Sequence, residues 1–136
     1  MTLIWLTAVF NYFMLKFLIN TFQQVYVTGL LSSFSGLFAY WHGGLLYKQL
    51  GLQRSLTLCF SISLLASLAI FFHGLDHQKS SLFPLEVVAA EYGVAASFTI
   101  IYVAHPSIFP VLFAATALGY VNFASRFMAA LAPVVA

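Results

Sequence analysis

Two ionisable side chains stand inside apolar stretches of this sequence, where a charge needs a reason to be present. Glu91 is set in FPLEVVAAEYGVAASF and Arg126 in ALGYVNFASRFMAALAP. Charged groups within apolar helices are costly, and they mark substrate paths or ties between helices. We expect Glu91 and Arg126 to form a pair. The pair either binds or gates a substrate, or stitches two neighbouring helices together, and the structural tie is the simpler of these interpretations.

Other polar residues accompany this pair in the apolar segments. Asn11, Tyr12 and Asn122 are of the type that lines a polar cavity between helices, and we predict that role for them. Lys16 stands near the end of its apolar segment, where a lysine can extend its ammonium to the membrane surface. Glu86 follows Pro84 at the start of another segment, and the positive end of a helix dipole favours an anion there.

The remaining reactive residue types do not assemble into a catalytic or metal-binding pattern. His73, Asp76 and His77 are of types that bind zinc, but no fourth ligand is nearby, so we predict no metal. The single cysteine, Cys59, excludes an internal disulfide, and we expect it to pack as a small apolar residue. His105, in a proline-bracketed turn, is expected to act as a polar cap. The sequence predicts neither an enzyme nor a cofactor.

The composition shows which environment these residues occupy. Of the 136 residues, 62% are hydrophobic and only 6% are charged, and the mean hydropathy is +0.99. A soluble domain carries about 25% charged residues. The net charge of +2 is too small to indicate nucleic-acid binding. We therefore expect an integral membrane protein whose first partner is the lipid bilayer.

The elements that must position the charges are five predicted transmembrane helices in one domain spanning residues 1–136. Polar or proline-containing breaks divide the chain into apolar segments of the length a bilayer requires. The predicted helices cover about residues 3–19, 25–47, 55–73, 83–104 and 110–134. We predict an all-α bundle, because open sheet edges cannot lie in lipid.

Small residues four positions apart should let these helices approach closely. The predicted contacts are made by the following pairs: Gly29 and Ser33, Ser32 and Gly36, Ser63 and Ser67, and Ala115 and Gly119.

The motifs of the last two segments resemble a known family. A helix containing glycine leads to a tyrosine-rich turn and a Phe-Pro pair, and the next helix contains glycine, Ser-Arg and a late proline. These positions are Gly93, Tyr102, Phe109, Pro110, Gly119, Ser125, Arg126 and Pro133. The chain resembles the C-terminal half of a major facilitator superfamily transporter of the organic cation/carnitine type. The likeness also covers WLTAVFNYFMLKFLINTF and LLYKQLGLQRSLTLCFSISLLASLAIFF, and stops before a twelfth helix.

Several positions depart from the family pattern. Around Gly51 the chain retains Lys48 and Arg54 but lacks the acidic residue and most of the basic run. The family glutamate before the Phe-Pro pair is Ser107 here, and the arginine after it is Ala114. In the family these charges are thought to latch one conformation of the transport cycle. The resemblance therefore implies a transporter-like fold whose latch has been lost.

Two functions follow as hypotheses. In the first, the chain is half of a transporter, which moves small organic ions only together with a partner half. In the second, it is a non-transporting structural or accessory subunit of a larger membrane complex, such as one in the mitochondrial inner membrane. Alternating access needs two helical bundles around a central site, which is why both hypotheses require other membrane subunits. The expected location is the plasma membrane or an organelle inner membrane.

Overall fold

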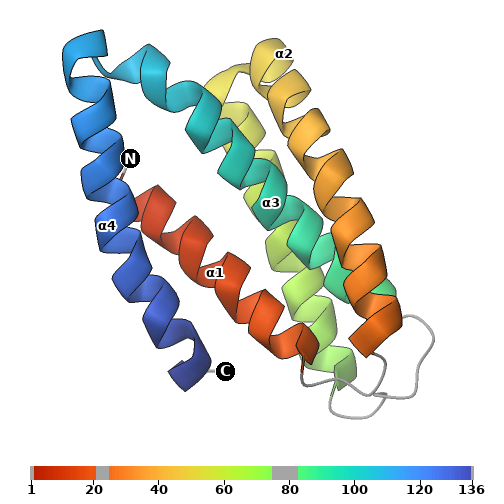
Figure 1. The fold of residues 1–136 in the computed structure, drawn as a ribbon. Coiled ribbons are helices and arrows are strands. Elements are labelled where there is room, and N and C mark those ends of the chain that lie inside the picture. The colour runs from red at the N-terminus through yellow and green to blue at the C-terminus, as the bar shows by residue number, and fades with distance from the viewer. Residues whose placement is uncertain (1, 21–24, 75–82, 136) are drawn as a thin grey trace.

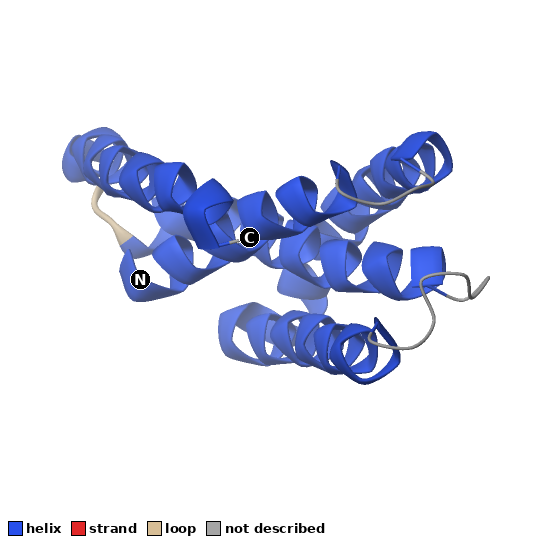
Figure 2. Ribbon diagram, turned by 90° about the horizontal axis from the view of Figure 1, so that it is seen from below, coloured by secondary structure: helices blue, strands red, loops and turns tan. Residues whose placement is uncertain are grey.

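The structure is a computed structural model that describes residues 2–20, 25–74 and 83–135. The described residues form four helices and contain no strand (Figure 2). The helices are α1 (Thr2–Asn20), α2 (Val25–Gly74), α3 (Phe83–Ile108) and α4 (Val111–Val135). The predicted all-helical class is confirmed for these residues, whereas the predicted number of helices is not.

Helix α2 accounts for the difference between five predicted helices and four observed ones. Its backbone is helical on both sides of Gly51, which alone adopts φ 76° and ψ 175°. Figure 1 shows the first half of α2 running along the bundle and the second half returning behind it. The predicted helices 25–47 and 55–73 are the two halves of this element. The loop predicted between them was wrong, because one glycine in the left-handed region turns the chain without added residues.

The turn between α3 and α4 is also shorter than predicted. Helix α3 continues past residue 104 to Ile108 with Pro106 in its last turn. The carbonyl of Pro110 accepts hydrogen bonds from the amides of Phe113 (2.9 Å) and Ala114 (3.0 Å), which starts α4. The buried ring of His105 contacts the carbonyl oxygen of Ala114 at 3.2 Å. That contact joins the two helices across the turn, as expected of a polar cap.

Helix α3 is the central element, and its most extensive contact is with α2. The closest approach is at Gly93, where an added Cβ would lie 2.6 Å from the Cys59 carbonyl oxygen. A second approach occurs at Gly43, whose Cβ would lie 2.8 Å from the Ala96 carbonyl oxygen. These glycines let the backbones of α2 and α3 nearly touch, which is how helices associate where hydrophobic driving force is weak.

Helix α1 lies between α3 and α4 (Figure 1). It packs extensively on α4 and less so on α3, whereas α3 and α4 touch only slightly. Trp5 anchors α1 against α3 through aromatic contacts, with ring centroids 4.5 Å from Tyr102 and 5.8 Å from Phe98. This order of helices determines which charged residues can meet.

In the described part of the chain, three helical stretches are long and apolar enough to cross a membrane. They are Tyr26–Phe72, Phe83–Ile108 and Val111–Leu131, and Thr2–Phe17 is a shorter apolar helix. Many large apolar side chains on them are exposed, including Tyr26, Leu37, Leu112 and Tyr120. Such surfaces belong in lipid or against another chain. The structure is therefore compatible with the multi-pass membrane protein that the composition predicts.

Candidate functional site

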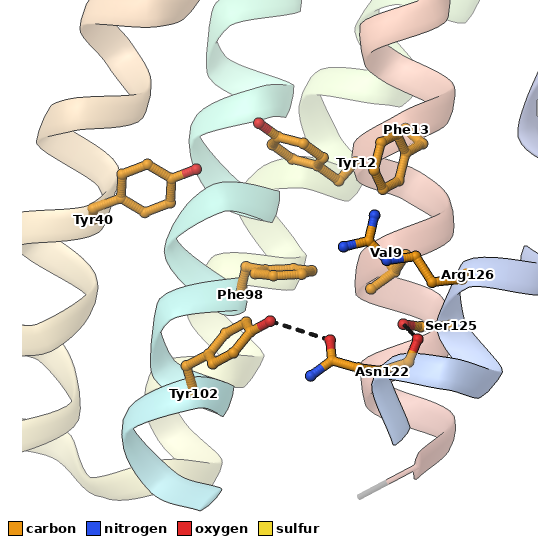
Figure 3. A pocket seen from close by; sticks show the side chains of 9 residues that line it. All are labelled: Val9, Tyr12, Phe13, Tyr40, Phe98, Tyr102, Asn122, Ser125 and Arg126. Carbon is orange, nitrogen blue, oxygen red and sulfur yellow. Dashed lines mark hydrogen bonds between the residues drawn. The ribbon is translucent and has the colours of Figure 1, made fainter. Parts of the chain in front are cut away.

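All four helices contribute to a cavity of about 200 Å³ beside Arg126 (Figure 3). Helix α1 provides an apolar and aromatic edge, α2 one tyrosine, α3 two aromatic rings, and α4 the polar groups. The lining residues are Val9, Tyr12, Phe13, Tyr40, Phe98, Tyr102, Asn122, Ser125 and Arg126. The cavity therefore combines aromatic surface with a single cation, and three of the predicted cavity residues (Tyr12, Asn122 and Arg126) lie together in it.

Arg126 has no counter-ion in the described part of the chain. Its guanidinium extends from α4 toward Tyr12 and Phe98 (Figure 3). No carboxylate in residues 2–20, 25–74 and 83–135 lies within 4.0 Å of it. A guanidinium presents several donors in a planar fork that fits carboxylate and phosphate groups. This side of the cavity is therefore suited to an anion.

Hydrogen bonds and ring contacts hold the rest of this cavity in shape. The hydroxyl of Tyr102 donates to Oδ1 of Asn122 at 3.2 Å, linking α3 to α4 across the opening. The ring of Phe98 lies 5.2 Å from that of Tyr102 and 6.0 Å from that of Tyr12. Helices α3 and α4, which touch only slightly, are thus bridged at this point by polar groups, with an aromatic wall beside them.

Glu91 pairs with Lys16, and not with Arg126 as the sequence had suggested. The two side chains form an ion pair between Lys16 Nζ and Glu91 Oε1 at 2.5 Å. Lys16 Nζ also donates to Ser32 Oγ at 2.8 Å, so α1, α2 and α3 meet at this ammonium. The predicted pair does not form, because α1 lies between α3 and α4 and carries Lys16 to the carboxylate first. Lys16 is thus a counter-ion rather than a residue reaching only for the membrane surface.

A second cavity, of about 170 Å³, surrounds this ion pair. Its lining residues are Tyr12, Lys16, Ser32, Ser33, Gly36, Tyr40, Glu91 and Ala95. Tyr12 and Tyr40 line both cavities, so the Arg126 cavity and the Glu91 cavity share a wall. Only Oε1 of Glu91 is engaged; Oε2 is buried and has no hydrogen-bond partner among the described residues. One carboxylate oxygen in this cavity is therefore available to a further ligand.

Asn11 and three of the motif positions, Lys48, Arg54 and Gly119, do not line either cavity. Asn11 Nδ2 donates to the Thr7 carbonyl oxygen in its own helix, and Asn11 is not among the residues lining either cavity. Gly119 has no atom within 4 Å of where its Cβ would be. Lys48 and Arg54 are exposed on either side of Gly51.

The α2 bend and the α3–α4 turn meet at one end of the bundle. The hydroxyl of Tyr47, just before the α2 bend, lies 3.0 Å from Ser107 Oγ, just before the Phe109–Pro110 turn. Figure 1 shows the α2 bend and the α3–α4 turn at this same end. An uncharged hydrogen bond therefore joins the α2 bend to the α3–α4 turn.

The histidine and aspartate cluster adds no site that the structure describes. Asp76 and His77 lie outside the described residues, as does the side chain of His73. Among the described residues no group of three or more metal-binding side chains comes together. Glu86 lies in the first turn of α3, at the helix end where the dipole favours an anion.

Sequence reasoning missed the role of Tyr40 and the partner of Glu91. Tyr40 is not among the predicted cavity residues, yet it lines both cavities. A usable signal existed for Lys16, because it is the other cation within an apolar segment. The buried carboxylate of Glu91 pairs with the cation that lies nearest in the folded bundle, Lys16. Which helices are neighbours cannot be deduced from the spacing of residues along the chain.

No family model, no curated protein and no solved structure matches this chain.

Proposed function

We propose that this chain is a multi-pass membrane protein that binds a small organic anion at Arg126 and translocates it together with a partner half. The observation that carries the proposal is the absence of any described counter-ion for Arg126 within an aromatic-lined cavity. An arginine held in an apolar bundle without a carboxylate is costly, and a bound anion offsets that cost. The sequence likeness to one half of a major facilitator transporter supports the requirement for a partner half.

The chemistry of the cavity defines the anion. The guanidinium takes a carboxylate or a similar planar anionic group, and Asn122 and Ser125 provide polar groups beside it. The rings of Phe98, Tyr102 and Tyr12 form an apolar wall for the body of the ligand. A benzoate-like monoanion satisfies both parts, and a cavity of about 200 Å³ limits the ligand to a small one.

Binding of radiolabelled benzoate to the purified protein in lipid nanodiscs tests the first half of this proposal. We expect saturable binding that falls by about tenfold or more in Arg126→Met, since a hydrogen-bonded charge pair contributes about 1.5–3 kcal/mol. Arg54→Met is the matched control, because it removes an exposed cation at the α2 bend and should leave binding unchanged. Equal binding by both variants, or no saturable binding by the unsubstituted protein, contradicts the proposal.

Uptake tests the second half. Proteoliposomes that contain the chain with its co-purified membrane partner should accumulate labelled benzoate, and those with Arg126→Met should not. Proteoliposomes with the chain alone should bind the anion without accumulating it, because one half cannot alternate access. Accumulation by the chain alone would show that two copies suffice and would replace the partner half by a second copy.

A structural subunit of a larger membrane complex is the second candidate. It is favoured by the exposed apolar surface of α4 and by the uncharged Tyr47–Ser107 contact at the position of the family latch. A subunit of this kind migrates on native gels with a large assembly and binds no benzoate. The same nanodisc binding measurement therefore separates the two functions. An organelle inner membrane suits the second candidate, and the plasma membrane suits the first.

A further inference from the structure

The Glu91 cavity has the features of a second binding site, distinct from the Arg126 cavity. Glu91 is 2% exposed and lines the cavity with one carboxylate oxygen, Oε2, unpartnered among the described residues. A buried carboxylate oxygen left without a partner is unusual in a folded protein and calls for an explanation. We propose that this cavity binds a small monovalent metal cation of the sodium class, and that the Lys16 ammonium occupies part of that site as a tethered competitor.

The surroundings of Lys16 Nζ resemble the coordination shell of a free cation. The ammonium contacts Glu91 Oε1 and Ser32 Oγ, and lies 5.7 Å from the centre of the Tyr12 ring. Ser33 and Tyr40 add further hydroxyl groups to the cavity lining. Oxygen ligands of this kind suit hard cations. A proton would need only the carboxylate, whereas a metal cation also uses the hydroxyl oxygens.

Charge balance favours a monovalent ion. Among the described residues, Glu91 is the only carboxylate lining the cavity, so one positive charge neutralises it and two would leave an excess in an apolar bundle. The side chain of Lys16 is 36% exposed while that of Glu91 is 2% exposed. Lys16 can therefore withdraw its ammonium along its flexible stem when a free cation enters. The exchange leaves the net charge of the cavity unchanged.

Binding of ²²Na⁺ to the purified protein in nanodiscs, at constant ionic strength with choline as the replacing ion, tests this inference. Lys16→Met removes the tethered competitor, so we expect its sodium affinity to rise by about tenfold or more over the unsubstituted protein. Glu91→Gln should abolish binding in both backgrounds. Ser32→Ala should weaken it without changing any charge. Glu86→Gln is the matched control for Glu91→Gln on the same helix, and it should bind sodium as the unsubstituted protein does.

Thermal unfolding gives a second readout that does not depend on anion binding. The melting temperature of Lys16→Met should rise with sodium and not with choline, because only a ligand of the folded state stabilises it. If the melting temperature of Lys16→Met rises on acidification but not on addition of sodium, a proton fills the site and the cation proposal is overturned. Equal sodium binding by the Lys16→Met, Glu91→Gln and unsubstituted proteins overturns it as well. Neither outcome affects the anion proposal for Arg126, which is tested separately by benzoate binding.

Discussion

The α2–α3 pair and the α1–α4 pair are built in different ways. In the most apolar stretch of α3, 61% of residues are buried, whereas the corresponding figure for α4 is 11%. Close backbone contact at Gly43 and Gly93 holds α2 against α3, while α4 touches the rest mainly through α1. The contrast teaches that α2 and α3 form the scaffold. The Glu91 cavity lies where α1 meets this scaffold, and the Arg126 cavity lies where both α1 and α4 meet it.

The largest effect should come from adding one methyl group to the scaffold. Gly93→Ala places a Cβ 2.6 Å from the Cys59 carbonyl oxygen and 2.8 Å from the Ser63 amide, which are backbone atoms that cannot turn aside. We expect a loss of about 3 kcal/mol in unfolding free energy, near the upper end for overpacking. Denaturant unfolding of the purified protein in mixed micelles, followed by circular dichroism, measures it.

Gly119→Ala is the matched substitution in α4. No atom lies within 4 Å of the added Cβ, so the change should be within about 0.5 kcal/mol. Equal losses for Gly93→Ala and Gly119→Ala would mean that α4 is packed as tightly as α3, and would remove the contrast between the two pairs.

Smaller changes in unfolding free energy are expected for substitutions at the two charged positions, Glu91 and Arg126. Glu91→Gln leaves the Lys16 ammonium without its carboxylate, but that ammonium is partly exposed and can reach water. We therefore expect a loss of about 1–2 kcal/mol, below the range for breaking a fully buried pair. Arg126→Gln removes a cation that has no described counter-ion, so it should leave the protein without bound anion equally stable or more so.

The same unfolding titration, run without sodium or anions that could fill either cavity, compares these two variants. A large loss in Arg126→Gln would reveal a structural partner for Arg126 and weaken the case for an anion site.

The apolar segments of the sequence were enough to predict where helices occur. The predicted ranges 3–19 and 110–134 agree with α1 and α4 to within one residue, because a bilayer sets the length of an apolar helix. The count failed at Gly51. Polar residues on both sides of it indicated a loop, yet they stay helical, and the positive φ of one residue makes the reversal.

Helix neighbours could not be predicted from spacing. Glu91 and Arg126 were expected to pair because both stand inside apolar segments, and that pattern does not show which helix lies between their two helices. The position of α1 between them decides that Lys16 takes the carboxylate. The small-residue rule held only in part. Ser63 lies against Gly93 at the close approach of α2 and α3, whereas Gly29 and Gly36 have no atom within 4 Å of a Cβ. The rule identifies small residues but not the face that another helix covers.

The α2 bend at Gly51 gives a further prediction about the stability of the α2–α3 scaffold. Gly51→Ala forces a side chain into a backbone with φ 76°, which costs about 1 kcal/mol. Gly44→Ala is a suitable control, since that glycine lies in the same helix with no positive φ and open space around its Cβ position. In the same denaturant unfolding measurement, Gly51→Ala should lose about 1 kcal/mol more unfolding free energy than Gly44→Ala. If Gly51→Ala is neutral, the bend is not a fixed part of the α2–α3 scaffold.

The smallest expected effect concerns the contact between Tyr47 and Ser107, which joins the α2 bend to the α3–α4 turn. Tyr47→Phe removes the hydroxyl that lies 3.0 Å from Ser107 Oγ and leaves the ring in place. Both groups are partly exposed and can hydrogen-bond with water or lipid headgroups instead, so we expect a loss of about 0.5 kcal/mol. Ser107→Ala should cost a similar amount, and the double variant should cost no more than either alone, because one shared contact is removed. Additive losses would show that Tyr47 and Ser107 act separately. The Tyr47–Ser107 contact would then contribute nothing to stability. This end of the bundle would be stabilised by the Gly51 bend and by the contact of His105 with Ala114.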